Sequence, residues 1–177
     1  MGDKSSAEKK WPGTRCIVTH NSIGIPHSFE ASYDTSEKIA LIDRVRYRAL
    51  DQYSTISVNI VTQGRKITKT AACLFLSLAW NCRIAGKNHH ESAAHLINEI
   101  YHAPGKSEVW ADAFTIEAFV RWTQSKNALG IGINVAVFNR DTGGIDLFHD
   151  GDIRYDRMIF LEFNPQAEHY CPLVLSV

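Results

Sequence analysis

The stretch that decides the fold is AACLFLSLAWNC, residues 71–82. Its apolar residues recur at helical spacing, which places on one face Leu74, Phe75, Leu78 and Cys82. This spacing predicts a helix over residues 71–82, with Thr70 as its N-cap. Cys73 would then occupy about the third position of the helix, where unpaired backbone N–H groups and the helix dipole favour an anion.

Two more helices are predicted after this one, over residues 91–102 and 111–124. Pro104-Gly105 ends the first of them. Its expected inward residues are Ala93, Ala94, Ile97, Ile100 and Tyr101. Those expected in the second helix are Phe114, Ala118, Phe119 and Trp122. Asp112 at the start of the second helix is the kind of acid that a helix dipole favours.

Strands flank this helical middle on both sides. A short strand is expected over 16–19 and another over 54–61, ended by Gln63-Gly64, while residues 36–53 fit a helix or a strand. After residue 130 the apolar period becomes two, which predicts strands over 131–138, 145–149 and 169–177. The nearly all-apolar stretch 158–163 predicts a central strand. Helices grouped in the middle and strands grouped at the end indicate an α+β fold.

The composition is that of an ordinary globular chain. Of 177 residues, 45% are hydrophobic and 21% are charged, which excludes wholesale disorder. Residues 1–12 are polar and predict a flexible tail, leaving 13–177 as a single expected domain. Lysine and arginine number 19 and so do the acids, so the net charge is zero. This balance disfavours a dedicated nucleic-acid binder, which usually carries a basic excess.

The cysteines and the hydropathy predict a compartment. The four cysteines form no CxxC pair and there is no run of about 18 apolar residues, so we expect neither a zinc knuckle nor a membrane span. These features, with no apolar leader, favour a cytoplasmic monomer with reduced thiols. Each cysteine is then a possible nucleophile.

A cluster of histidines, His89, His90, His95 and His102, raises the question of a metal site. His90 and His95 are five residues apart, which turns them about 140° from each other on a helix. His95 and His102 share a face, but two ligands are too few for a structural zinc. We therefore expect exposed or capping histidines, and no metal or cofactor.

Cys73 and His169 are the candidate nucleophile and base. A thiolate at a helix N-terminus has a lowered pKa, and Lys69 nearby would add positive potential. His169 begins the last predicted strand, and histidine is the side chain suited to share a proton near pH 7. The alternatives are a buried structural cysteine, the commoner fate of such a residue, and a histidine without a role.

Four segments taken together resemble the ovarian-tumour (OTU) family of cysteine proteases, mostly deubiquitinases, in the family's chain order. The first, CLFLSLA at 73–79, resembles the family's nucleophile helix. The second, WAD at 110–112 followed by Glu117-Ala118, resembles the family's Trp-Gly/Ala…Glu-x-x-Ala helix. The third, NALGIGINVAV at 127–137, resembles the strand that follows this helix. The fourth, EHYCPLV at 168–174, resembles the catalytic His-Tyr strand. The motifs span about residues 65–177.

The resemblance implies a papain-like, OTU-like α+β fold in which helices pack on a small, mostly antiparallel sheet. It implies that Cys73 attacks the carbonyl after the C-terminal glycine of ubiquitin or a ubiquitin-like modifier, with His169 as base. The backbone of Ala71, Ala72 and Cys73 would form the oxyanion hole. The small size resembles compact OTU domains of viral polyproteins, which would put the protein in a host cytoplasm and allow polyprotein processing as an alternative activity.

The chain departs from the family pattern at two places. The family usually has Asp-Gly-Asn before the cysteine, where this chain has Thr70-Ala71-Ala72, and many members have Asp or Asn where this chain has Cys171. Asn164 or Glu168 is therefore a candidate third member that orients the histidine. A second hypothesis is an OTU-like module that binds ubiquitin without catalysis, and a third is an unrelated α+β domain with Cys73 and His169 far apart.

Overall fold

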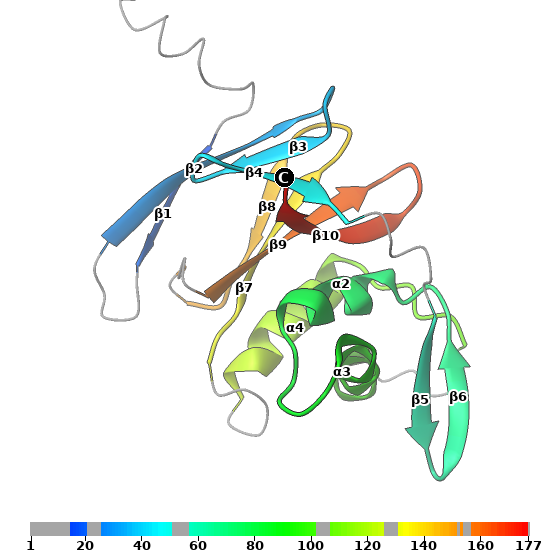
Figure 1. The fold of residues 1–177 in the computed structure, drawn as a ribbon. Helices are drawn as coiled ribbons and strands as arrows, with labels where there is room; N and C mark the ends of the chain where they lie inside the picture. The colour runs from blue at the N-terminus through cyan, green and yellow to red at the C-terminus, as the bar shows by residue number, and fades with distance from the viewer. Residues whose placement is uncertain are drawn as a thin grey trace, which may run out of the picture.

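The computed structural model describes residues 15–20, 26–50, 57–101, 107–125, 131–151, 153 and 157–176. The predicted tail, residues 1–12, lies outside the described residues, as do Tyr53, His102 and Pro104-Gly105. The described chain is mixed α+β, with three α-helices that lie below a largely antiparallel sheet (Figure 1). Its strands and helices run in the order β1 (Arg15–His20), β2 (Pro26–Asp34), β3 (Ile39–Ile42), β4 (Val45–Ala49), β5 (Val58–Thr62), β6 (Arg65–Lys69), α2 (Cys73–Asn81), α3 (His89–Leu96), η1 (Ile97–Tyr101), α4 (Ala113–Gln124), β7 (Asn134–Asn139), β8 (Ile145–Phe148), β9 (Met158–Asn164) and β10 (His169–Leu175).

Eight strands form the main sheet, in the order β1-β2-β3-β4-β10-β9-β7-β8. Every neighbouring pair is antiparallel except β7 and β9, which are parallel. The apolar strand predicted to be central is β9, and it lies between β10 and β7. The strands β5 and β6 form a separate hairpin that projects beside the helices (Figure 1).

The sheet curls so that its two faces bury two cores. One face packs on the helices, in a cluster that includes Phe75, Phe119 and Leu161. The other face closes on itself, because β2 returns over β7 and β8, and its cluster includes Phe29 and Phe138. Successive residues of β9 and β10 point alternately into these two cores, as the period of a strand requires.

Two hairpins depend on turns that the sequence pattern indicated only in part, since Gln63-Gly64 was predicted as the end of a strand and Asp43-Arg44 was not predicted as a turn. Residues 36–53, whose pattern fits a helix or a strand, form the two strands β3 and β4 as far as Ala49. Asp43 and Arg44 between them both have left-handed backbone, at φ 49° and 67°. A two-residue loop of this kind matches the twist of a hairpin, although neither residue is the usual glycine or asparagine.

Strand β6 was not predicted, because residues 65–69 are mostly charged and polar. Gln63 and Gly64 close the β5–β6 hairpin with φ of 53° and 74°, and Thr62 pairs with Arg65. The expected end of a strand at Gln63-Gly64 is therefore a tight turn into a second strand.

Helix α2 begins two residues later than predicted, and Thr70 is not its N-cap. Ala72 holds that position and offers no side-chain hydrogen bond. Thr70 instead pairs with a distant segment, because its N–H donates to the Ser107 carbonyl at 2.8 Å and its carbonyl accepts from the Val109 N–H at 2.9 Å. This non-local bridge overrides the local capping preference and places Cys73 at the first helical position.

The other helices have side-chain caps. Asn88 and Glu91 form a reciprocal capping box at α3, and Asp112 accepts from the N–H groups of Phe114 and Thr115 at α4. The prediction that Phe114 points inward is wrong, since this side chain is 77% exposed. The buried residues of α4 are Ile116, Phe119, Val120 and Thr123. In the described part of the chain, no helix is long and apolar enough to cross a membrane.

Candidate functional site

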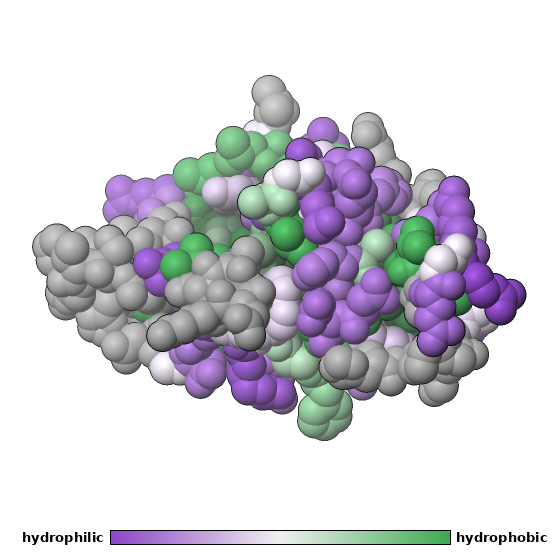
Figure 2. All heavy atoms as spheres, turned by 90° about the horizontal axis from the view of Figure 1, so that it is seen from below, coloured by the Kyte–Doolittle hydropathy of each residue, from purple (hydrophilic) through white to green (hydrophobic). Residues whose placement is uncertain are grey.

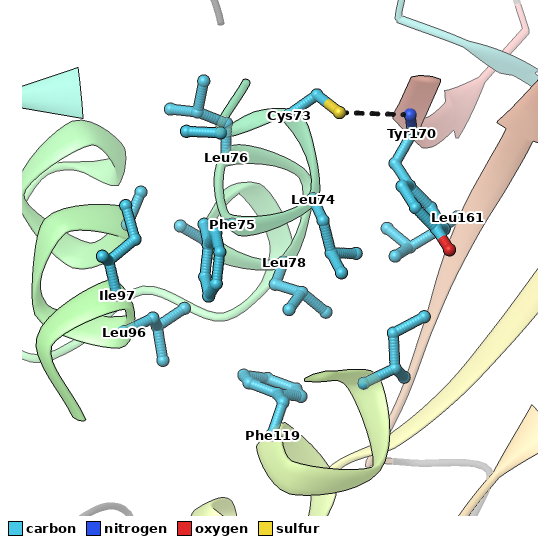
Figure 3. Packing of buried hydrophobic residues seen from close by; sticks show 14 of the residues in the cluster. Cys73, Leu74, Phe75, Leu76, Leu78, Leu96, Ile97, Phe119, Leu161 and Tyr170 are labelled. Atoms are coloured by element: carbon cyan, nitrogen blue, oxygen red, sulfur yellow. Dashed lines mark hydrogen bonds between the residues drawn. The ribbon is translucent and has the colours of Figure 1, made fainter. Parts of the chain in front are cut away.

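Cys73 is the first residue of α2 and lies against the start of β10. Its Sγ accepts a hydrogen bond from the Tyr170 backbone N–H at 3.5 Å, across 97 residues of sequence (Figure 3). The residue is buried, with 6% of its surface exposed. The first turn of α2 therefore brings the predicted nucleophile to the strand that carries the predicted base.

The contact between α2 and β10 replaces a strand pairing. Strand β4 pairs with β10 only from Leu173 onward. At the earlier residues of β10 the first turn of α2 lies alongside, and the Ser77 Oγ is 2.7 Å from the Cys73 carbonyl oxygen and 3.1 Å from the Tyr170 carbonyl oxygen. The Tyr170 N–H donates to Cys73, and the Tyr170 C=O shares the single Ser77 hydroxyl proton with the Cys73 carbonyl, so both contacts hold the start of α2 beside the strand.

His169 is the first residue of β10, immediately before Tyr170, and is half-buried. Tyr170 packs in the helical core, whereas Cys171 belongs to the core on the other face. Strand alternation therefore directs the His169 side chain to the face of Cys171. Cys73 and His169 are neighbours through the Tyr170 amide, which Cys73 contacts and which directly follows His169 in the chain.

The electrostatics of Cys73 differ from the expectation of a low pKa. Burial raises the pKa of the Cys73 thiol, and the N–H groups of Tyr170, Leu74 and Cys73 itself counteract part of this rise. Lys69, expected to add positive potential, is buried with 2% exposure. Burial therefore favours the neutral thiol of Cys73 over its thiolate.

The predicted oxyanion segment, Ala71 to Cys73, leads directly into the first turn of α2. The first helical hydrogen bond runs from Leu76 N–H to the Ala72 carbonyl at 3.0 Å, so the preceding N–H groups have no acceptor within the helix. Ala71 has φ of 56°, in the left-handed region that favours glycine.

Of the two candidates for the third member, Asn164 is the better placed. It pairs directly opposite His169 in the β9–β10 register, so their Cβ atoms lie on one face. Its Oδ1 accepts from the Ala167 N–H at 3.4 Å. Glu168 is exposed in the turn between the strands and has φ of 48°.

A buried acid that sequence reasoning missed lies on the same face. Glu162 is 1% exposed, accepts a 2.5 Å hydrogen bond from the Tyr33 hydroxyl and is 3.5 Å from the Arg140 guanidinium. It pairs opposite Cys171 in the sheet. The available signal was a charged residue inside the apolar run 158–163, since such a residue is rarely buried without partners.

The three described histidines of the cluster, His89, His90 and His95, lie on α3. His89 contacts the Trp80 and His90 rings, and burial lowers its pKa, with smaller contributions from His90 and Arg83. His95 lies 3.8 Å from Glu99. Within the described residues, no three His, Cys, Asp or Glu side chains gather in a way that could hold a metal ion.

Comparisons with protein families, with curated proteins and with solved structures find no match for this chain.

Proposed function

We propose that the protein is a cysteine-dependent deubiquitinase or isopeptidase that cleaves after the C-terminal glycine of ubiquitin or a ubiquitin-like modifier. The observation that carries the proposal is the contact of Cys73 Sγ with the Tyr170 amide, one residue from His169. A candidate thiol at a helix start, beside the strand that carries a candidate base, supports a thiol acyl-transfer mechanism.

In the proposed reaction, His169 accepts the Cys73 proton and the thiolate attacks the carbonyl carbon of the terminal glycine. Backbone N–H groups at the start of α2 stabilise the oxyanion that forms. The tetrahedral intermediate expels the lysine amine, to which the imidazolium returns its proton, and a thioester remains. Water, deprotonated by His169, then hydrolyses the thioester and releases the modifier.

Asn164 would orient the imidazole in this scheme. Because burial favours the neutral thiol, we propose that proton transfer from Cys73 to His169 accompanies substrate binding or attack, without a preformed thiolate–imidazolium pair. Displacing water from the site strengthens the hydrogen bonds that stabilise the developing charge.

The test is turnover of ubiquitin that carries a fluorogenic amide at its C-terminus. We expect hydrolysis by the unaltered protein, no detectable hydrolysis by Cys73→Ala, and a loss of at least about 100-fold in kcat/KM for His169→Ala, which removes the general base. Cys16→Ala and His95→Ala are matched controls, since both residues lie away from α2's start and should leave kcat/KM within about twofold. Equal activity of Cys73→Ala and the unaltered protein would refute the proposal.

One observation favours a second function, a module that binds ubiquitin without cleaving it. Cys73 is buried with a raised pKa, and Cys171 stands where the family often has Asp or Asn. A titration of ubiquitin into the protein, followed by NMR, would show saturable binding in this case. The fluorogenic amide would remain intact after prolonged incubation.

A further inference from the structure

Positive charge is gathered in one part of the chain, although the net charge of the whole chain is zero. Residues 52–90 contain five lysines and arginines and no aspartate or glutamate. The acids that balance these cations lie outside this segment, so the even total conceals a local basic excess. Within the segment, the side chains of Arg65, Lys66 and Arg83 are exposed. A local basic surface attracts anionic partners whatever the net charge of the chain.

A row of rings at the end of α2 and the start of α3 lies next to this charge. The Arg83 guanidinium lies 6.0 Å from the centre of the Trp80 ring. The His89 ring meets Trp80 edge to face, with ring centres 5.5 Å apart, and the His90 ring follows 4.5 Å from His89. His90 is exposed, and Trp80 and His89 are half-buried. The row therefore runs out from the helical core to the surface.

A cleft of about 600 Å³ joins this row of rings to the β5–β6 hairpin. His90 and Asn88 line the cleft from α3, and Asn59, Lys66 and Thr68 line it from the exposed face of the hairpin. Figure 2 shows this side of the molecule, where hydrophilic residues gather over α3 and the hairpin. The rings and the basic hairpin therefore border one continuous surface.

The walls of the cleft suit phosphate oxygens. The Asn59 side-chain oxygen accepts from the Thr68 hydroxyl at 2.7 Å, and the Asn88 side-chain oxygen accepts from the Glu91 N–H at 2.8 Å. Each of these amides still presents its NH₂ group as a donor. Glu91, the acid among the described residues of the cleft, accepts from the Asn88 N–H at 3.0 Å in the capping box of α3. Donors and the Lys66 cation thus dominate the walls.

We propose that single-stranded nucleic acid binds across the cleft and the row of rings. The residues that we expect to carry this binding are called the basic–aromatic strip: Lys66, Trp80, Arg83, His89 and His90. Its cations contact phosphates along the backbone, and its rings provide surfaces on which unpaired bases stack. The inference is independent of the proposed hydrolysis, because Trp80 and Arg83 lie at the opposite end of α2 from Cys73.

The rings select a single strand over other polyanions. A duplex keeps its bases stacked inside and offers mainly phosphates, so it would use the cations and leave the rings without a partner. An acidic peptide would also contact the cations alone, since it has no base to stack on a ring. Cations and rings arranged along one surface match a chain in which phosphates and unpaired bases alternate.

The test is fluorescence anisotropy with a labelled oligouridylate of about 12 nucleotides, a length within the range of single-strand sites. We expect saturable binding that weakens as salt rises. Lys66→Glu and Arg83→Glu should each raise Kd at least about fivefold and reduce the slope of log Kd against log salt by at least about one. His90→Ala, measured at pH 8 where histidine is largely neutral, should raise Kd at least about fivefold with the slope unchanged.

The matched controls reverse exposed arginines on other elements. Arg48→Glu on β4 and Arg121→Glu on α4 should leave Kd within about twofold at physiological salt. Cys73→Ala should bind like the unaltered protein, so a protein that binds the oligouridylate but hydrolyses nothing supports the strip and refutes the proposed catalysis. An oligothymidylate of the same length distinguishes RNA from DNA, and equal or weaker binding of it supports the inference.

Three results would overturn the inference. The first is no saturable binding at low salt, and the second is the same rise in Kd for the strip variants and the arginine controls. The third is tighter binding of a polyglutamate of equal charge, which would assign the strip to an acidic protein. Where a variant does not fold, an NMR titration of the unaltered protein decides: the oligouridylate should shift the amide signals of Lys66 and His90 and not that of Arg121, and the reverse pattern would refute the strip.

Discussion

At the scale of single residues, strained backbone and buried thiols flank helix α2. Ala71 has a left-handed backbone just before the helix, Cys73 is buried at its first position, and Cys82 is buried at its C-cap. The left-handed backbone and the burial of the thiols each affect the free energy of unfolding. Single substitutions at these positions therefore test both effects.

The left-handed backbone of Ala71 predicts a stabilising substitution. Ala71→Gly removes the clash of Cβ with the carbonyl, which costs about 1–2 kcal/mol, and loses part of that gain to the greater freedom of glycine in the unfolded chain. We expect a net gain of up to about 1 kcal/mol in the free energy of unfolding by urea. Ala72→Gly, where φ is −94°, should give no gain, and equal gains from both variants would contradict the argument.

The buried thiols predict a loss of stability at high pH. Burial raises the pKa of Cys82 to about 11 and that of Cys73 above its ordinary value of 9.0. The unfolded chain therefore releases these protons at lower pH than the folded chain, and stability falls as pH rises above about 9. The Cys82 share approaches about 2–3 kcal/mol above pH 11. Urea unfolding at pH 8 and pH 10.5 should show that the free energy of unfolding falls less in Cys82→Ala than in the unaltered protein. An equal fall in both proteins would contradict the argument.

At the scale of elements, the local sequence predicts the long periodic segments and fails where a distant partner decides. The helices predicted over 71–82, 91–102 and 111–124 correspond within a few residues to α2, to α3 with η1, and to α4. Helix α4 buries one face, whereas every residue of α2 from Cys73 to Ala79 is buried. The hairpin turns at Asp43-Arg44 and Gln63-Gly64 were missed or incompletely read, since Asp43, Arg44 and Gln63 adopt positive φ without being glycine.

The candidate site shows the same limit. Cys73 and His169 could be proposed from residue type and chain order, but the contact of Cys73 with the strand that begins at His169 depends on the first turn of α2 lying along β10, across 97 residues. The position of Asn164 opposite His169 follows from the register of a hairpin. The exposure of Phe114 could not be predicted, because helical spacing alone does not show which residues of a helix extend beyond the part that packs on the core.

Helix capping gives a prediction at this scale. Asp112→Ala removes the side-chain acceptor at the start of α4 and should lower the free energy of unfolding by about 1 kcal/mol. Thr70→Ala should cost less than about 0.5 kcal/mol, because the Thr70 side chain does not cap α2. Thermal or urea unfolding of both variants compares them, and a larger loss in Thr70→Ala would contradict the assignment of the caps.

At the scale of the whole molecule, the closure of the sheet depends on a buried polar link between its distant strands. The Tyr33 hydroxyl on β2 donates to Glu162 on β9, which Arg140 also approaches. Tyr33→Phe leaves the buried carboxylate short of a donor and should cost about 1–3 kcal/mol of unfolding free energy. Tyr47→Phe, whose ring packs on Phe160, is the control and should cost less than Tyr33→Phe. Equal costs in urea unfolding would mean that the link does not close the sheet.

The central claim is that Cys73 and His169 act as one site, and the most direct measurement is covalent capture by ubiquitin that carries an electrophile in place of its C-terminal carboxylate. Mass spectrometry should find a single adduct on Cys73, formed at a rate that drops at least about 100-fold in His169→Ala. Cys16, which is exposed on the edge strand β1 far along the sheet from β10 and His169, should remain unmodified. A folded protein that forms no adduct on Cys73, or one that labels Cys73 equally well without His169, would contradict the account.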